Sequence, residues 1–382
     1  MSCDVRPHYS QSPISELNIV ADGSIGLFGQ GRGGLDAGWH IRVKVQEKPL
    51  ANQPLLVNTA KTMSAITQLE DDPELHDYLV KRVGKAHLRR RIGVETEHVA
   101  DRFGQGRTFF HIENWHAAAA MIQLILRIGG LRQRGRTNAL DFRVRHNKLA
   151  LPHLPEIFDG FTLLHLSDLH LDSMAEFPER LAQSINHLEY DICVLTGDYL
   201  FATHGPYQEA MRGLERLCRD IDKDVYAILG NHDSIMMTHP IESLGIRLLL
   251  NENICIERES RSLFLAGIDD PHYFAADNLE KAYEGIPDDA VSLLLAHSPE
   301  IYRHAAYVGF DFMMCGHTHA GQICLPGSIA LTYNSSAPRF TGAGAWSYDL
   351  MQGYTSAGTG CSVVPVRFNC PPEITLHRLS KA

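Results

Sequence analysis

Residues that could bind metal ions recur at five places in the C-terminal two thirds of the chain. They are carboxylates, imidazoles and one amide, in the runs Asp168-Leu-His170, Gly197-Asp198, Gly230-Asn231-His232-Asp233, His297 and Gly316-His317-Thr318-His319. Oxygen and nitrogen donors of this kind suit Mn, Fe, Zn or Mg, and they do not suit soft metals that prefer thiolate. A carboxylate such as Asp198 can bridge two cations, and paired metals about 3.5–4 Å apart stabilise both oxygens of an in-line phosphoryl displacement. The donor types therefore indicate phosphoester hydrolysis.

Each of these runs follows a short apolar segment that would place it. The segments are Thr162–Leu166, Ile192–Leu195, Val225–Leu229, Val291–Ala296 and Phe310–Cys315. They are rich in Val, Ile and Leu and are separated by helical patterns, which predicts strands buried on both faces of an α/β fold. Ligands of such sheets bind beyond the carboxyl ends of the strands. We therefore expect the five loops to converge on one site.

In this order, the motifs resemble those of the calcineurin-like metallophosphoesterases. The resemblance runs from about Phe161 to Leu379 and includes the runs Gly267-Ile-Asp-Asp270 and Ala320-Gly-Gln322. It implies a four-layer α/β/β/α sandwich and two divalent metal ions, with Mn favoured over Fe, Zn or Mg. The implied ligands are Asp168, His170, Asp198 and His319 for one ion, and Asp198, Asn231, His297 and His317 for the other.

The resemblance also implies a mechanism. A hydroxide that bridges the two ions is the expected nucleophile, because metals lower the pKa of bound water toward roughly 7. His232 is then the expected catalytic side chain, which stabilises the phosphoryl oxygens or protonates the leaving alkoxide. The implied bond is a phosphodiester or a pyrophosphate.

Two further runs narrow the resemblance within the family. The Ser/Thr protein phosphatases carry Asp-Arg-Gly after the second motif, whereas this chain has Asp198-Tyr199-Leu200. The run Gly316 to Gln322 and the later Gly358-Thr359-Gly360 are similar to a bacterial phosphodiesterase subgroup near the UDP-2,3-diacylglucosamine pyrophosphatases of lipid A synthesis. The family usually has Gly where this chain has Ala320, and a methyl group should be tolerated there unless the loop needs a positive φ.

Two other functions remain open at this stage. The protein could be a UDP-2,3-diacylglucosamine pyrophosphatase, whose nucleotide-linked lipid substrate would need an apolar pocket. It could also be a non-catalytic metal-binding scaffold, because a fold alone does not establish activity. All the implied ligand positions are present, which favours an enzyme.

Charge divides the chain into two parts. Residues 1–150 carry 21 basic and 15 acidic residues, whereas the remainder carries 14 basic and 30 acidic ones. Acidic residues around a site for divalent cations are expected, and an acidic domain disfavours a nucleic-acid partner. We predict an N-terminal extension of undefined role at 1–110, a basic amphipathic helix and linker at 111–150, and the phosphoesterase domain at 151–382.

The remaining composition indicates a cytoplasmic protein. The eight cysteines are scattered without a disulfide framework, which suits a reducing compartment. Residues 1–19 lack the basic start and apolar run of a secretory signal. No stretch reaches the roughly 18 consecutive apolar residues of a spanning helix.

A helix predicted from Trp115 to Leu131 leaves two interpretations open. Its polar positions form one narrow stripe, and Arg132, Arg134 and Arg136 follow it. A helix of this kind could lie in the surface of an anionic membrane, such as the inner membrane. It could instead pack against the catalytic domain or a second subunit, and we favour this second interpretation slightly. The sequence does not define the oligomeric state.

Overall fold

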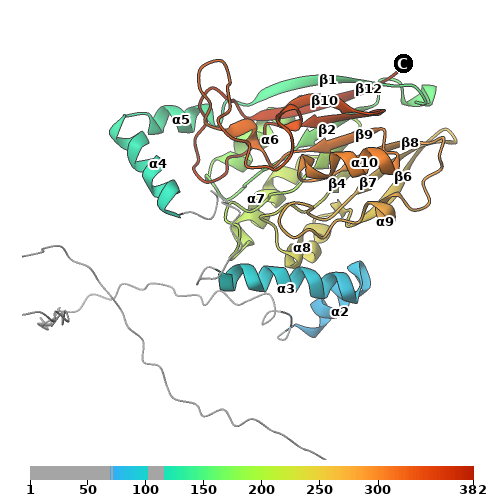
Figure 1. Ribbon diagram of the computed structural model, residues 1–382, viewed down its shortest axis with the longest axis horizontal. Coiled ribbons are helices and arrows are strands. Elements are labelled where there is room, and N and C mark those ends of the chain that lie inside the picture. Colours follow the sequence, from blue (N-terminus) through green and yellow to red (C-terminus); the bar gives the residue numbers. More distant parts are fainter. Residues whose placement is uncertain (1–68, 70–71, 102–115) are drawn as a thin grey trace, which may run out of the picture. The chain divides into compact units, whose positions relative to one another are not determined.

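Two mixed sheets form the centre of the protein (Figure 1). The computed structural model describes residue 69, residues 72–101 and residues 116–382, and these described residues belong to one compact unit. The first sheet has the spatial order β1 (Arg143–Leu151), β12 (Glu373–Lys381), β2 (Thr162–Leu166), β3 (Ile192–Leu195), β4 (Val225–Ala227) and β5 (Arg247–Leu248). The second has the order β10 (Gly344–Tyr348), β11 (Met351–Thr355), β9 (Phe312–Cys315), β8 (Val291–Leu295), β7 (Arg261–Gly267) and β6 (Glu252–Arg258).

Parallel pairing places the functional loops at the same ends of these sheets. Strands β2 to β5 are parallel to one another, and β7, β8, β9 and β11 are likewise parallel. The edge strands β10 and β6 are antiparallel to their neighbours, and β12 is antiparallel to β2 but parallel to β1.

The two sheets face one another across an apolar layer. Leu163 and Val194 of the first sheet and Leu265, Leu293 and Met314 of the second belong to one buried cluster. The central strands β2, β3, β8 and β9 are buried on both faces, because helices cover the outer side of each sheet. This arrangement explains why the sequences of these strands are mostly apolar runs rather than alternating ones.

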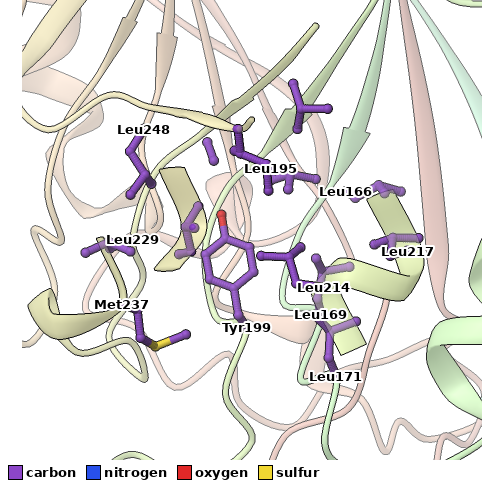
Figure 2. Packing of buried hydrophobic residues seen from close by; sticks show 14 of the residues in the cluster. Leu166, Leu169, Leu171, Leu195, Tyr199, Leu214, Leu217, Leu229, Met237 and Leu248 are labelled. Carbon is purple, nitrogen blue, oxygen red and sulfur yellow. The ribbon is translucent and has the colours of Figure 1, made fainter. Parts of the chain in front are cut away.

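Helices complete the four layers. The first sheet is covered by α6 (Phe177–Ile185), α7 (Gln208–Cys218) and α8 (Thr238–Ser243), and the second by α9 (Leu279–Tyr283) and α10 (Tyr302–Val308). Figure 2 shows Leu214 and Leu217 of α7 packed close to Leu166 and Leu195. Short 3-10 turns lie at Glu156–Phe158, Ile235–Met237, Pro299–Ile301, His319–Gly321 and Arg339–Thr341. The predicted four-layer α/β/β/α sandwich is confirmed.

The predicted strands differ from the observed ones only at their ends. Strands β2 and β3 have the predicted bounds, whereas β4 and β8 end earlier, at Ala227 and Leu295. Strand β9 begins at Phe312 rather than at Phe310, because the Phe310 N–H donates to the Ala305 carbonyl and so closes the end of α10.

Two helices near the N-terminus pack against the first sheet and its covering helix α8. They are α2 (Pro73–Val83) and α3 (Lys85–Asp101). Helix α2 begins at Asp72, whose carboxylate accepts the Leu75 N–H at 3.0 Å, and is followed by Gly84 at φ 86°. Its Arg82 donates to Glu242 at 2.9 Å and to the Leu248 carbonyl at 2.6 Å. Part of the predicted extension is therefore in contact with α8 and β5, while the domain boundaries as a whole stay a prediction.

The predicted apolar helix is present as α4 (His116–Ile128), followed by α5 (Arg132–Asn138). Trp115 lies outside the described residues. Leu126 is 8% exposed and packs against Val364 and Val366, whereas the other side of α4 faces outward. One side of α4 therefore packs against the rest of the chain, as one interpretation predicted, while contact with a membrane stays a prediction. None of the helices within the described ranges is long and apolar enough to cross a bilayer.

Candidate metal centre

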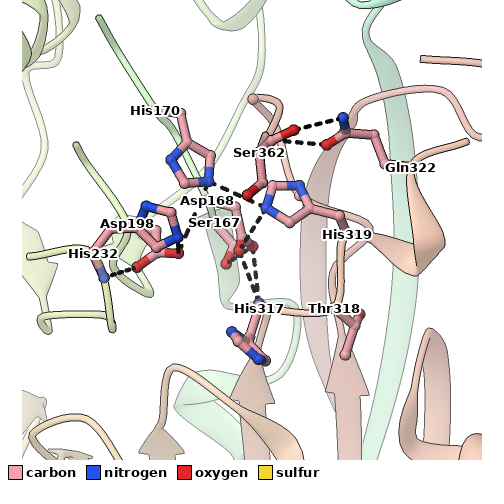
Figure 3. A network of polar contacts seen from close by, with 12 residues as sticks. Ser167, Asp168, His170, Asp198, His232, His317, Thr318, His319, Gln322 and Ser362 are labelled. Carbon is pink, nitrogen blue, oxygen red and sulfur yellow. Dashed lines mark hydrogen bonds and ion pairs between the residues drawn. The ribbon is translucent and has the colours of Figure 1, made fainter. Parts of the chain in front are cut away.

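The five sequence motifs meet at the ends of β2, β3, β4, β8 and β9. Figure 3 shows side chains from four of them, the motifs at Asp168, Asp198, His232 and His317. Three overlapping groups of side chains place their ligand atoms within 4.8 Å of one another: Asp168, His170 and His319; His170, Asp198 and His232; and Asp198, His297 and His317. All of these residues are buried, with Asp198 shared between two groups. The loops of two sheets, rather than of one, thus supply the site.

Backbone carbonyls orient four of the imidazoles. The pairs are His170 Nδ1 with Leu200 O (2.8 Å), His232 Nδ1 with Phe201 O (3.0 Å), His297 Nδ1 with Thr196 O (2.7 Å) and His317 Nε2 with Asn334 O (3.0 Å). A ring nitrogen that donates to a carbonyl carries the proton, so the other nitrogen of a neutral ring has a lone pair. Histidines that bind metals are usually held in this way.

The inward ring nitrogens converge on one another and on the oxygens of Asn231 and Asp198. His170 Nε2 lies 3.2 Å from His319 Nε2. His297 Nε2 lies 2.9 Å from Asn231 Oδ1 and 3.3 Å from Asp198 Oδ2. Acceptors that face acceptors in a buried space require a cation or a proton between them, and nitrogen and oxygen donors suit hard or borderline divalent ions. The residues present therefore fit a divalent-metal centre.

The electrostatics of the carboxylates lead to the same requirement. Burial, together with the nearby Asp198 charge, raises the pKa of Asp168 to about 6 against the lowering effect of His297. Burial also opposes ionisation of Asp198, but the charges of His297 and His232 hold its pKa well below the usual range. Two buried carboxylates at one point thus need positive charge beside them.

Asp233 ties the loops of β3 and β4 together. Its carboxylate accepts the N–H groups of Asp198 at 2.7 Å, Tyr199 at 2.8 Å and Gly230 at 2.8 Å. Asp198 in turn accepts the His232 N–H at 2.9 Å. Asp233 does not face the metal-ligand groups. Its role is to hold the backbone that presents Asp198, a role that the sequence motif alone did not assign.

Backbone strain occurs at several residues of this site. Several non-glycine residues have positive φ: Asp168 (53°), His170 (42°), Asp198 (59°), His317 (69°), His319 (48°) and Ala320 (47°). Such conformations persist where the surrounding structure over-determines them. The loop does need a positive φ at Ala320. The condition under which the sequence predicted a well-tolerated methyl group is therefore not met, and this residue is strained. For an L-residue this conformation costs roughly 1–2 kcal/mol.

Two glycines of the motifs are required by close approach to the carboxylates. A Cβ atom at Gly230 would collide with Asp198, and one at Gly316 would collide with Ser167 and Asp168. These glycines let the β4 and β9 loops approach the acidic side chains of the β3 and β2 loops.

Comparison with known proteins identifies the family. The calcineurin-like phosphoesterase profile matches residues 161–321. An uncharacterized metallophosphoesterase of Bacillus subtilis, YkoQ, is 30% identical over 227 residues, which cover 57% of this chain and 83% of that protein. The chain belongs to the calcineurin-like phosphoesterase family. It is therefore a hydrolase of a family that uses divalent metals, and its His and Asp clusters could bind them.

Two other relatives differ in how much of their length this chain covers, and one of them is named a transmembrane protein. The phosphodiesterase YaeI of Escherichia coli is 27% identical over 237 residues, covering 57% of this chain and 82% of that protein. A Danio rerio transmembrane protein with a metallophosphoesterase domain is 30% identical over 257 residues, covering 62% of this chain and 56% of that protein. This phosphoesterase thus spans little more than half of its fish relative.

Helix α3 precedes residues 161–321, which match the family profile, yet its side chains contact the loops of the metal centre. Arg91 is fully buried, and its Nη2 donates to the Asp233 carbonyl at 2.8 Å. Its Nε lies 3.5 Å from Asp269, which also bonds His87 at 2.7 Å. Glu95, one helical turn further on, accepts the Ile235 N–H at 2.8 Å and the Ser234 hydroxyl at 2.7 Å.

Sequence reasoning missed these contacts. Arg89, Arg90 and Arg91 are consecutive in the sequence, and only Arg91 of the three is buried. The available signal was the spacing of His87, Arg91 and Glu95, which places three polar residues on one face of a helix. That face contacts the segment that follows His232.

We expect Glu95→Ala to slow the enzyme, because it leaves the Ile235 N–H and the Ser234 hydroxyl without this acceptor. The free energy of unfolding should fall by about 1–3 kcal/mol, and kcat by about tenfold to a hundredfold if the loop shifts. Steady-state hydrolysis and urea unfolding measure the two effects. Glu95→Gln keeps one acceptor oxygen and should recover most of the activity, whereas the exposed Arg89→Ala is the control. Full turnover by Glu95→Ala would contradict a positioning role.

Proposed function

We propose that the protein is a dinuclear, divalent-metal-dependent enzyme that hydrolyses a phosphodiester or pyrophosphate bond. The observation that carries this proposal is the shared carboxylate. Asp198 Oδ2 lies 3.3 Å from His297 Nε2 and 3.9 Å from His170 Nε2, so that it faces donors of two different groups. A carboxylate so placed suits a bridge between two cations.

The donors divide into two proposed ligand sets. One comprises Asp168, His170, Asp198 and His319, and the other comprises Asp198, Asn231, His297 and His317. Two bound ions would activate a water molecule and neutralise charge on the phosphoryl oxygens. We propose manganese as the native metal, since the donors are oxygen and imidazole nitrogen without thiolate.

His232 is the proposed catalytic side chain. Its Nδ1 donates to the Phe201 carbonyl at 3.0 Å, which turns Nε2 toward the centre, 3.8 Å from Asp198 Oδ2. The residue also lines the cavity that opens beside the metal centre. From this position the protonated ring can donate to a phosphoryl oxygen or to the leaving oxygen, as general acids do.

Two substitutions separate metal binding from proton donation. Asp198→Ala should abolish turnover and lower the bound metal from about two equivalents, because both proposed sets lose a ligand. His232→Ala should retain its metal and lose about 10²- to 10⁴-fold in kcat. Elemental analysis of the purified variants and steady-state kinetics provide the measurements. A His232→Ala enzyme with wild-type kcat would refute the assigned role.

Turnover of defined substrates tests the proposed function directly. We expect the manganese-loaded protein to hydrolyse bis-p-nitrophenyl phosphate and to lose that activity on chelation. UDP-2,3-diacylglucosamine in detergent tests the narrower candidate, which the aliphatic residues beside the centre favour. Release of UMP that is absent from Asp198→Ala would support it. Activity on the aryl diester alone would exclude the narrower substrate, and inactivity on both would favour a non-catalytic scaffold.

We also propose a peripheral, cytoplasmic-side contact between the segment 115–136 and anionic membranes. The outward residues of α4 are apolar, and Arg127, Arg132 and Arg134 beside them are exposed. Apolar and basic side chains together favour the interface of an anionic bilayer. Flotation with anionic and with neutral vesicles at low salt measures this contact, and failure to float with the anionic vesicles would exclude it.

A further inference from the structure

A cavity of about 410 Å³ opens beside the metal centre. Its volume falls in the range of roughly 300–1,000 Å³ that is common for small-molecule sites. One end is lined by Asp198, His232, His317 and His319, which the proposed function places around the reacting phosphorus. Whatever occupies this cavity therefore lies next to the bond that would be cleaved.

The rest of the cavity has a different chemistry. Its walls include the aliphatic side chains Ile122, Ile125 and Leu126 of α4, together with Leu331, Val363 and Val364. Leu126 packs against Val364 and Val366, with Ile122 and Val363 beside them. Helix α4 is therefore held against the 363–366 segment by buried side chains, so this wall of the cavity is part of the packed structure.

Two aliphatic side chains that line the cavity are exposed to solvent. Ile125 of α4 is 60% exposed, and Leu331, which comes from a distant segment of the chain, is 71% exposed. Leu325 and Ile329, close to Leu331 in the sequence, are exposed but do not line the cavity. Exposed aliphatic side chains grouped at a cavity are unusual on a soluble surface and indicate an apolar ligand.

We propose that this cavity holds the alkyl or acyl chain of the substrate, so that the enzyme acts on phosphate esters of amphiphilic molecules. The inference rests on the proposed phosphoesterase function and names its substrate class. The phosphate group lies at the polar end, beside His232 and His317, and the chain extends from it past Ile122 and Ile125 toward Leu331. An apolar chain is favoured over a polar substituent because most of the surface that lines the cavity is apolar and replaces few of the hydrogen bonds that water makes. The cavity is also lined by the polar residues Thr318, Gln322, Thr332, Asn334 and Ser362.

Chain-length dependence tests the proposal through binding alone. Isothermal titration of the metal-loaded protein should show octyl phosphate binding at least about tenfold more tightly than ethyl phosphate, since each buried methylene adds up to about fourfold in affinity. The double variant Ile125→Gln with Leu331→Gln changes two exposed side chains of the cavity and should reduce this preference to about threefold or less. Circular dichroism establishes that the variant is folded.

Leu124→Gln is the matched control. Leu124 is 57% exposed on the same helix but does not line the cavity, so its variant should keep the wild-type preference for octyl phosphate. Equal affinity for octyl and ethyl phosphate in the wild type, or an unchanged preference in the double variant, would overturn the proposal. A loss of preference in Leu124→Gln equal to that in the double variant would also overturn it, because the outer face of α4 rather than the cavity would then bind the chain.

Hydrolysis of bis-p-nitrophenyl phosphate, measured in parallel, separates the two levels of the argument. A protein that cleaves this diester without any preference for octyl phosphate keeps the proposed function and loses the chain site. A protein that prefers octyl phosphate but cleaves no ester keeps the chain site and loses the proposed function.

Discussion

The burial of negative charge is the constraint on which the rest of the site depends. Asp168, Asp198 and Asp233 lie almost without solvent contact beyond the ends of three neighbouring strands of the first sheet. Unpaired carboxylates are costly in such a place, so each needs hydrogen-bond donors or positive charge around it. Asp233 is satisfied by backbone N–H groups, whereas Asp168 and Asp198 face inward imidazoles whose lone pairs also need a cation. The same chemistry that would destabilise an ordinary core thus creates affinity for metal ions.

The sandwich provides the rigidity that such a centre requires. Strained residues such as Asp198 and His317 remain in place because the strands before them are buried between two sheets and their covering helices. Buried histidines behind the metal centre also help to position its ligands. Burial lowers the pKa of His165 to about 3, so the ring stays neutral and bonds both His377 at 3.1 Å and the Thr196 hydroxyl at 2.8 Å. The carbonyl of Thr196 is the acceptor that orients His297. The geometry of the centre therefore depends on residues well behind it.

The parts that could be predicted from the sequence are those determined by short stretches of chain. The strand before Asp168 and the strand before Asp198 have the predicted bounds, because a buried parallel strand is a continuous apolar run. The donors themselves follow from residue type and order. The α3 contacts could not be predicted, because Glu95 meets Ser234 and Ile235 across about 140 residues and nothing local in either segment indicates the other. The strain at Ala320 was equally hidden, since φ depends on how the β9 loop closes over the site.

Selectivity within this family must come largely from outside the metal ligands. Ions held by Asp, His and Asn recognise phosphoryl oxygens, which all phosphoesters share, so the ligand set alone cannot distinguish one ester from another. The aliphatic wall of this phosphoesterase comes instead from α4, which precedes the matched residues 161–321, and from the 331 and 363–364 segments, which follow them. Helix α4 is held there by Leu126 and Val364, a contact independent of the metal centre. A metal centre and a separately anchored wall would allow the substrate to change without any change in the proposed ligands.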